Sequence, residues 1–280
     1  MISNLELEKI LNAKVEKTEI IRKKDGIVVS RIFYDKKTCV IKYFKNKEYL
    51  REIEAYKLLY DLKIKTLKIL YFGENFLIME DLNNVKEYRL ATYEDLEDDK
   101  VLKNLAKWYK NLHQKGISCD FSKMYNENDI ITEENLKMLS SRLGEENVEF
   151  LLSYFDDFVK FKNSLSYTLV YNDFAFENLI VGKNVAFMYD FNFLGKGYVY
   201  ADVKNVLSML SKEKKSVFLD FYGQAIFLEK EEIAYNVLQT LSAFIKASLM
   251  SKFPRWAEGM AERIKSESFK NYVKNIKQYI

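Results

Sequence analysis

The chain has 280 residues, of which 48% are hydrophobic and 15% aromatic, and its formal net charge is +3 at pH 7. This composition allows a sizeable hydrophobic core, in one large domain or two packed lobes, and argues against a disordered or collagen-like chain. The small net charge gives no indication of a nucleic-acid partner. No apolar run approaches the length of a membrane-spanning helix, so we expect no membrane partner.

The small numbers of cysteine and histidine residues exclude several kinds of metal site and catalytic mechanism. The two cysteines, Cys39 and Cys119, match no metal-binding spacing and suit a reducing compartment, so we predict a cytoplasmic location. The single histidine, His113, excludes HExxH metalloproteases and leaves Ser–His–Asp chemistry only if this residue takes part. We interpret His113, near the end of a predicted helix at 100–115, as structural. Any catalysis should then depend on carboxylates, amides and lysines.

The first 80 residues predict a small antiparallel sheet. The pair Asp25-Gly26 lies between two β-branched runs, which is a strong hairpin signal. The predicted elements in chain order are strands at 18–24, 27–34 and 38–44, a helix at 46–62, and strands at 66–72 and 76–80. The connections between neighbouring strands are too short for parallel crossovers, so we expect every strand pair to be antiparallel.

Beyond residue 84 the pattern becomes helical. The predicted helical regions are 100–115, 133–162, 202–228 and most of 231–280. They are interrupted by the segment 169–181, LVYNDFAFENLIV, in which two apolar runs flank a polar centre. We therefore predict an α+β fold with a small antiparallel-sheet lobe at residues 1–82 and a larger, mainly helical lobe at residues 83–280.

The interrupting segment begins a short predicted hairpin. Residues 178–181 and 185–189 form its strands, and GKN forms a three-residue turn between them. Asn178 begins one strand and Asp190 follows the other, so the two residues should lie side by side. Oxygen ligands of this kind suit Mg²⁺, which prefers one or two protein carboxylates together with phosphate oxygens. Asp173, on the loop before the hairpin, is left free to accept a proton. Each of the three could instead be an ordinary loop or strand-end residue.

The sequence YNDFAFEN, followed by YDFN, resembles the catalytic loop and metal-binding motif of aminoglycoside phosphotransferases and choline kinases, a branch of the protein-kinase-like fold. The resemblance implies that Asp173 is the catalytic base and that Asn178 and Asp190 bind Mg²⁺. A further aspartate usually follows in these families, and GKGYVYADV supplies Asp202, which we interpret as structural.

The resemblance extends upstream to the predicted sheet. CVIKYF offers Lys42 as the lysine that binds the nucleotide phosphates, and REIEAYKLL offers Glu52 as its ion-pair partner, with Glu54 as a competing assignment. The implied roles are nucleotide binding by the first lobe, and catalysis and acceptor binding by the second.

The segment FLIMEDL resembles the hinge of these kinases. The resemblance implies that the backbone around Glu80, Asp81 and Leu82 meets the adenine ring. The implied cofactors are ATP and Mg²⁺, although the sequence does not decide between ATP and GTP.

Two departures from the family pattern stand out. Tyr171 takes the place of the catalytic-loop histidine, and Asn172 replaces the usual small residue. A tyrosine can still pack and donate a hydrogen bond at this place. The hairpin that would cover the phosphates has one glycine, Gly26, and no GxGxxG motif.

The resemblance implies an ATP-dependent phosphotransferase that phosphorylates a hydroxyl group of a small molecule. The stretch from Asp190 to Asp202 is too short for a long peptide-presenting segment, which disfavours a protein kinase. An aminoglycoside, a choline-like amino alcohol and a sugar remain open as acceptors, as does the oligomeric state. Acidic stretches at 94–99 and 229–232 could attract a cationic acceptor or could be solvated helix faces. Aromatic residues that could form a substrate cage or belong to the core are Tyr198, Tyr200, Phe244, Phe253 and Trp256.

The alternative is a catalytically inactive nucleotide-binding pseudokinase with a structural or regulatory role. The pair Tyr171-Asn172 is its main support, whereas the presence of Lys42, Asp173 and Asp190 argues for an enzyme.

Overall fold

The computed structural model describes residues 2–223 and 229–280. The chain divides into two compact units. Unit 1 comprises the residues up to Lys115 together with Tyr171–Leu194 and Asn205–Gly223, and unit 2 comprises Gly116–Val170, Gly195–Lys204 and the residues from 229 onward. The units differ from the predicted lobes because the segment around Asp173 and Asp190 groups with the first 115 residues. The lobe boundary at residue 82 stays a prediction.

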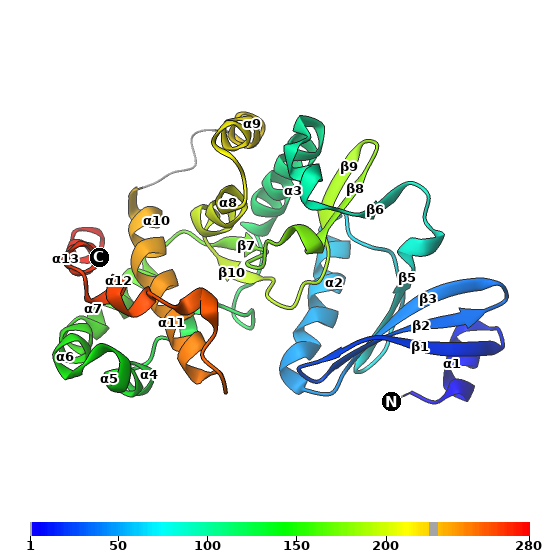
Figure 1. Ribbon diagram of the computed structural model, residues 1–280, viewed down its shortest axis with the longest axis horizontal. Helices are drawn as coiled ribbons and strands as arrows, with labels where there is room; N and C mark the ends of the chain where they lie inside the picture. Colours follow the sequence, from blue (N-terminus) through cyan, green and yellow to red (C-terminus); the bar gives the residue numbers. More distant parts are fainter. Residues whose placement is uncertain (1, 224–228) are drawn as a thin grey trace. The chain divides into compact units, whose positions relative to one another are not determined.

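Unit 1 contains the predicted antiparallel sheet (Figure 1). Its five strands lie in the order β1-β2-β3-β5-β4, which was not predicted. Its strands are β1 (Val15–Lys24), β2 (Ile27–Tyr34), β3 (Lys37–Phe44), β4 (Ile69–Phe72) and β5 (Phe76–Glu80). Asp25 and Gly26 form the turn between β1 and β2 with φ angles of 50° and 79°. A two-residue hairpin turn of this kind needs left-handed backbone, which glycine and aspartate tolerate.

One face of this sheet packs on a helix that the sequence analysis did not predict, α1 (Asn4–Leu11). Ser3 caps α1 by accepting a hydrogen bond from the backbone N–H of Glu6. The core between helix and sheet consists of Leu7, Val15, Ile32, Cys39, Ile41, Phe76 and Ile78. Because side chains alternate along a strand, the neighbouring residues Val40 and Lys42 point to the opposite face.

Helix α2 (Arg51–Asp61) follows a 3₁₀ turn at Lys47–Leu50, so the α-helix is shorter than the predicted 46–62. Five of its residues are buried, and four of them recur at helical spacing: Glu52, Ile53, Tyr56 and Leu59. Glu52 is thereby buried on the same helix face as three apolar residues. The free-energy cost of burying its carboxyl group must be offset by a partner charge or by hydrogen bonds.

Unit 1 also contains a three-stranded sheet of β6 (Tyr88–Leu90), β8 (Leu179–Gly182) and β9 (Val185–Met188). The predicted hairpin is confirmed, although its turn has two residues rather than three because Gly182 pairs with Val185. Strand β6 was not predicted. Helix α3 (Asp99–Gly116) confirms the predicted helix. His113 is buried with its Nδ1 2.6 Å from the Tyr222 hydroxyl, which agrees with a structural role.

Unit 2 is mainly helical. The predicted helix at 133–162 is four helices, broken in part at Gly144, whose φ of 80° suits glycine. Strands β7 (Thr168–Val170) and β10 (Gly195–Gly197) pair antiparallel. The helices that lie at least partly in unit 2 are α4 (Glu133–Met138), α5 (Ser140–Leu143), α6 (Glu145–Ser153), α7 (Phe155–Asn163), α8 (Val199–Ser208), α10 (Glu229–Ala234), α11 (Thr240–Leu249), α12 (Met260–Lys265) and α13 (Glu267–Asn275).

The predicted helix at 202–228 corresponds to α8 and α9 (Lys212–Tyr222), and its last residues, 224–228, lie outside the described residues. The core of unit 2 includes Tyr198, Tyr200 and Phe244, whereas Trp256 is 56% exposed. Three of the five aromatic residues considered for a substrate cage are therefore core residues. Over residues 2–223 and 229–280, no helix combines the length and the apolarity that crossing a membrane requires.

Candidate active site

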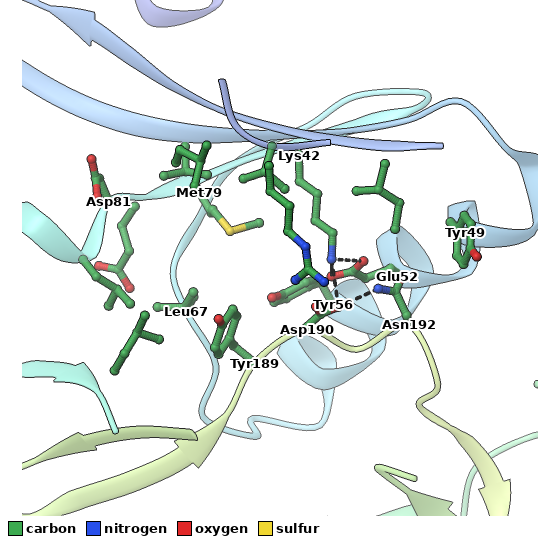
Figure 2. Close-up of a pocket in the computed structure, with 18 of the residues that line it drawn as sticks. Lys42, Tyr49, Glu52, Tyr56, Leu67, Met79, Asp81, Tyr189, Asp190 and Asn192 are labelled. Atoms are coloured by element: carbon green, nitrogen blue, oxygen red, sulfur yellow. Dashed lines mark hydrogen bonds and ion pairs between the residues drawn. The ribbon is translucent and has the colours of Figure 1, made fainter. Parts of the chain in front are cut away.

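Unit 1 contains a cavity of about 470 Å³ between the sheet, helix α2 and the segment after β9 (Figure 2). This volume lies within the usual range for small-molecule sites. Seven of the eight residues predicted for the site line the cavity: Lys42, Glu52, Glu80, Asp81, Leu82, Asp173 and Asp190. The eighth, Asn178, does not line it but contacts Asp173.

Lys42 lies at the centre of an ion-pair network (Figure 2). Its Nζ is 2.8 Å from Oε1 of Glu52 and 2.8 Å from Oδ1 of Asp190. Lys42 is 7% exposed and Glu52 is fully buried. Glu54, the competing assignment, is exposed and pairs with Lys57 instead. Strand β3, helix α2 and the chain after β9 thus each supply one charged group to the same point.

Burial and charge act in opposite directions in this network. Burial by itself lowers the pKa of Lys42, but the carboxylates of Glu52 and Asp190 outweigh burial and raise it, so the ammonium form is retained. Burial raises the pKa of Glu52 to about 7 in spite of the attraction of Lys42, and Asp190 adds to the rise. Two carboxylates share one cation here, so a further cation placed beside Asp190 would meet a favourable potential.

The hairpin β8–β9 brings Asn178 and Asp190 together, as predicted. The backbone N–H of Tyr189 donates to the carbonyl of Asn178 at 3.0 Å, which joins the two strand ends. Asp190 has a left-handed φ of 63°, and its Oδ1 accepts a hydrogen bond of 2.5 Å from the Asn192 amide. The Asp190 side chain is 24% exposed, so it remains accessible from the cavity.

Asp173 lies beside this hairpin end. The side-chain amide of Asn178 is 3.4 Å from both the carbonyl oxygen and Oδ2 of Asp173. Within the described part of the chain, three or more His, Cys, Asp and Glu side chains nowhere gather as a metal cluster. The donor set of Asp190 and Asn178, one carboxylate and one amide, fits Mg²⁺ only where phosphate oxygens and water complete the coordination.

The two departures from the family pattern are accommodated by specific contacts. Tyr171 is fully buried, and its hydroxyl donates to the carbonyl of Tyr189 at 2.6 Å. Its ring packs edge-on against Trp108 and Phe191. Asn172 has a left-handed φ of 64°, which asparagine tolerates better than most residues, and its amide donates to the carbonyl of Phe193 at 3.1 Å.

The side chain of Glu80, at the end of β5, is occupied by protein groups. Its Oε1 accepts hydrogen bonds from the backbone N–H of Lys68 at 2.7 Å and from the hydroxyl of Tyr88 at 2.5 Å. The carboxylate of Glu80 is therefore engaged within the protein, and the hinge role of Glu80 stays a prediction.

The side chain of Asp81 is likewise engaged. It accepts hydrogen bonds of 2.5 Å from Nε of Arg31 and 2.6 Å from the hydroxyl of Thr38. Burial tends to raise the pKa of Asp81, but these hydrogen bonds outweigh burial and lower it. The segment after β5 is thus tied to strands β2 and β3 by a carboxylate that stays ionised.

Several residues that line the cavity were not predicted from the sequence. Val40 lies two residues before Lys42 on β3 and therefore points to the same face of the sheet. Arg31 and Met79 lie opposite Val40 on the neighbouring strands, so both could have been predicted to line the cavity. Arg22 also lines the cavity. The sequence does not predict this position, because the direction of the Arg22 side chain depends on an irregularity in β1.

An antiparallel sheet whose lysine pairs with a helix glutamate, beside a loop with paired acidic and amide groups, defines a protein of the kinase-like fold. The chain belongs to the phosphotransferase enzyme family (APH), whose family model matches residues 40–236.

Solved structures agree with this fold. The chain is similar to choline kinase LicA from Streptococcus pneumoniae, with 14% identity, 97% of each chain covered and a TM-score of 0.62. It is also similar to a putative fructosamine-3-kinase from Thermobifida fusca, with 13% identity, 98% of each chain covered and a TM-score of 0.63. A spectinomycin phosphotransferase in complex with ADP and spectinomycin shows 12% identity, 99% coverage of each chain and a TM-score of 0.59. Comparison of the sequence with curated proteins gave no match.

Proposed function

We propose that this protein is a small-molecule kinase that transfers the γ-phosphoryl group of ATP to a hydroxyl group. The observation that carries the proposal is the position of Lys42, which bridges Glu52 and Asp190 in a cavity that Asp173 also lines. Buried lysines are costly unless paired, and this one faces a cavity of the right size for a nucleotide. Membership of the phosphotransferase family supports the same activity.

In this proposal the side chains act mainly by positioning and by charge, because phosphoryl transfer has a loose transition state. Lys42, oriented by Glu52, binds the α- and β-phosphates. Asp173 orients the acceptor hydroxyl and takes its proton as the acceptor oxygen bonds to the γ-phosphorus and the bond to ADP breaks. Asp190 and Asn178 would hold Mg²⁺, which supplies positive charge to the phosphate oxygens.

The hinge residues Glu80, Asp81 and Leu82 would bind the adenine ring through their backbone. The side chains of Glu80 and Asp81 are held by other protein groups. The backbone N–H of Glu80 and the carbonyls of Asp81 and Leu82 are also hydrogen-bonded within the protein, so the base would bond to the remaining backbone groups of this segment, such as the N–H groups of Asp81 and Leu82. The ion pair between Asp81 and Arg31 would keep this backbone in one conformation, so that less conformational entropy is lost when the nucleotide binds.

For the acceptor we propose a small hydroxylated molecule, such as an aminoglycoside, an amino alcohol or a sugar. The support is the fold shared with choline kinase, spectinomycin phosphotransferase and fructosamine kinase structures. A cationic acceptor is included because the acceptors named for several of these relatives carry amino or quaternary ammonium groups.

The contacts of Tyr171 and Asn172 favour the enzyme over the pseudokinase alternative. Tyr171 supplies a buried hydrogen bond next to Asp190, and Asn172 adopts its left-handed conformation with a hydrogen bond of its own. Neither residue displaces Asp173, Lys42 or Asp190 from the cavity.

The test measures ADP release from ATP and Mg²⁺ across a panel of hydroxylated amines and sugars. We expect turnover with at least one acceptor and its loss in Asp173→Asn. The matched control is Glu177→Gln, which removes an exposed carboxylate from the same loop and should leave turnover unchanged. Intact ATP binding without turnover on any acceptor would favour the inactive alternative, and equal turnover in Asp173→Asn would remove the proposed base.

A further inference from the structure

Strand β1 brings a third basic side chain into line with the cavity. In the antiparallel register Arg22 lies opposite Val29, and Val29 lies opposite Lys42. Residues directly opposite each other in antiparallel strands point to the same face, so Arg22 and Lys42 belong to one cross-strand row. Both line the cavity. Neighbouring strands are about 4.8 Å apart, so the two residues are separated by about 10 Å at the backbone, with the cavity beneath them.

An irregularity in β1 decides the direction of Arg22. Ile20 pairs with Ser30 and Arg22 with Val29, so Ile21 is an extra residue on the β1 side. Strict alternation after Ile20 would put Arg22 opposite Val28, on the other face of the sheet. The bulge shifts the register by one residue and turns Arg22 toward the cavity.

The adjoining hairpin turn lacks the usual means of holding phosphates. Its two residues, Asp25 and Gly26, connect β1 directly to β2 and contain one glycine. A glycine-rich loop would offer several backbone N–H groups to an anion, whereas a two-residue turn offers few. Basic side chains lie near the turn instead, because both Arg22 and Lys24 line the cavity.

The surroundings of Arg22 leave its guanidinium available to a ligand. Within residues 2–223 and 229–280, the side chain of Arg22 takes part in no hydrogen bond or ion pair, and its backbone pairs with Val29.

We propose that Arg22 is a second phosphate-binding residue of the nucleotide site. Its planar guanidinium can donate two parallel hydrogen bonds to phosphate oxygens, which a glycine-poor turn cannot provide. The inference rests on the proposed function, because it assumes that the cavity binds a nucleoside polyphosphate. Lys42 would approach the phosphates from the centre of the sheet, and Arg22 from its β1 edge.

The test is titration calorimetry of the full chain with Mg·ATP, ADP and adenosine. In Arg22→Gln we expect Kd to rise about tenfold for ATP, as for the loss of one charge-assisted contact, with no change for adenosine. Arg22→Lys keeps the positive charge but lacks the paired N–H donors, so its Kd for ATP should lie between those of the wild type and Arg22→Gln. The matched control is Lys23→Gln, because Lys23 is exposed and pairs with Val28 on the opposite face.

Three outcomes would overturn the assignment. Equal ATP affinity in Arg22→Gln and Lys23→Gln would show that Arg22 does not bind phosphate. An equal loss for ATP and adenosine would show that Arg22 acts on the base or on folding. Absence of ATP binding in the wild type would instead remove the proposed function, and this inference with it, so the two failures are distinguishable.

Discussion

The hydroxyl of Tyr171 donates a hydrogen bond of 2.6 Å to the backbone carbonyl of Tyr189. Tyr171 lies two residues before Asp173, and Tyr189 immediately precedes Asp190. One buried contact therefore joins the loop of the proposed base to the strand end of the proposed metal ligand. Because Tyr171 is fully buried among aromatic rings, it is held rigidly enough to fix the spacing between the two aspartates.

We expect Tyr171→Phe to destabilise the protein by about 1 kcal/mol, since it removes one buried hydrogen bond and leaves a carbonyl unpaired. Turnover should fall more than nucleotide affinity, because the loop of Asp173 loses its link to Asp190. Denaturant unfolding and steady-state kinetics measure the two effects. Tyr60→Phe is the control, since Tyr60 is 79% exposed and should change neither. Wild-type turnover in Tyr171→Phe would show that the contact has no functional role.

The pair Glu52 and Glu54 offers a matched comparison on one helix. Glu52→Gln removes the carboxylate that orients Lys42, and we expect a decrease of about tenfold or more in kcat/KM for ATP, equivalent to about 1.4 kcal/mol or more. Glu54→Gln removes an exposed carboxylate whose partner is Lys57, and should leave kcat/KM unchanged. Equal effects of the two substitutions would contradict the assignment of Glu52.

Glu52 should also make stability depend on pH. Burial raises its pKa in the folded protein from the ordinary 4.5 to about 7. The folded state thus keeps the proton where the unfolded chain has lost it, so this contribution is fully present below 4.5 and is lost as the pH rises through about 7.

The measurement for this pH dependence is the unfolding free energy of the wild type relative to Glu52→Gln, whose side chain stays neutral. We expect the difference to fall steadily from about pH 5 to about pH 8. A difference that rises over this range would mean that Lys42 outweighs burial and lowers the pKa of Glu52.

Asn172 tests the left-handed backbone beside Asp173. Asn172→Ala places a side chain that resists this conformation at φ 64° and removes the hydrogen bond to Phe193, so we expect a loss of about 2 kcal/mol. Asn172→Gly loses only the hydrogen bond and should cost about 1 kcal/mol. Thermal and chemical unfolding report both values. Greater stability of the alanine variant than of the glycine variant would exclude backbone strain as the cause.

Much of the fold could be predicted from local sequence signals. The turn at Asp25-Gly26 and the alternation of β-branched residues set the hairpin, and the apolar periodicity of 100–115 set α3. The approach of Asn178 to Asp190 also followed from a hairpin whose ends must meet. These features depend on neighbours in the sequence, which is why one chain was enough to predict them.

Other features depend on tertiary contacts and could not be predicted. Helix α1 is stabilised by packing Leu7 on the sheet, and β6 exists because it pairs with β8, far along the chain. Which of Glu52 and Glu54 pairs with Lys42 depends on which face of α2 is buried, and tertiary packing sets that face. The direction of Arg22 depends on a single extra residue in β1, since strands without it would turn the same side chain away from the cavity.

The central claim is that the cavity beside Lys42, Glu52 and Asp190 is the phosphate site of a kinase. The most direct measurement is a crystal structure with a non-hydrolysable ATP analogue and Mg²⁺. We expect the phosphates within hydrogen-bonding distance of Lys42 Nζ, the metal on Asp190 and Asn178, and the base against the backbone of residues 80–82. A nucleotide bound elsewhere, with the contact between Lys42 and Asp190 unchanged and this cavity vacant, would contradict the account.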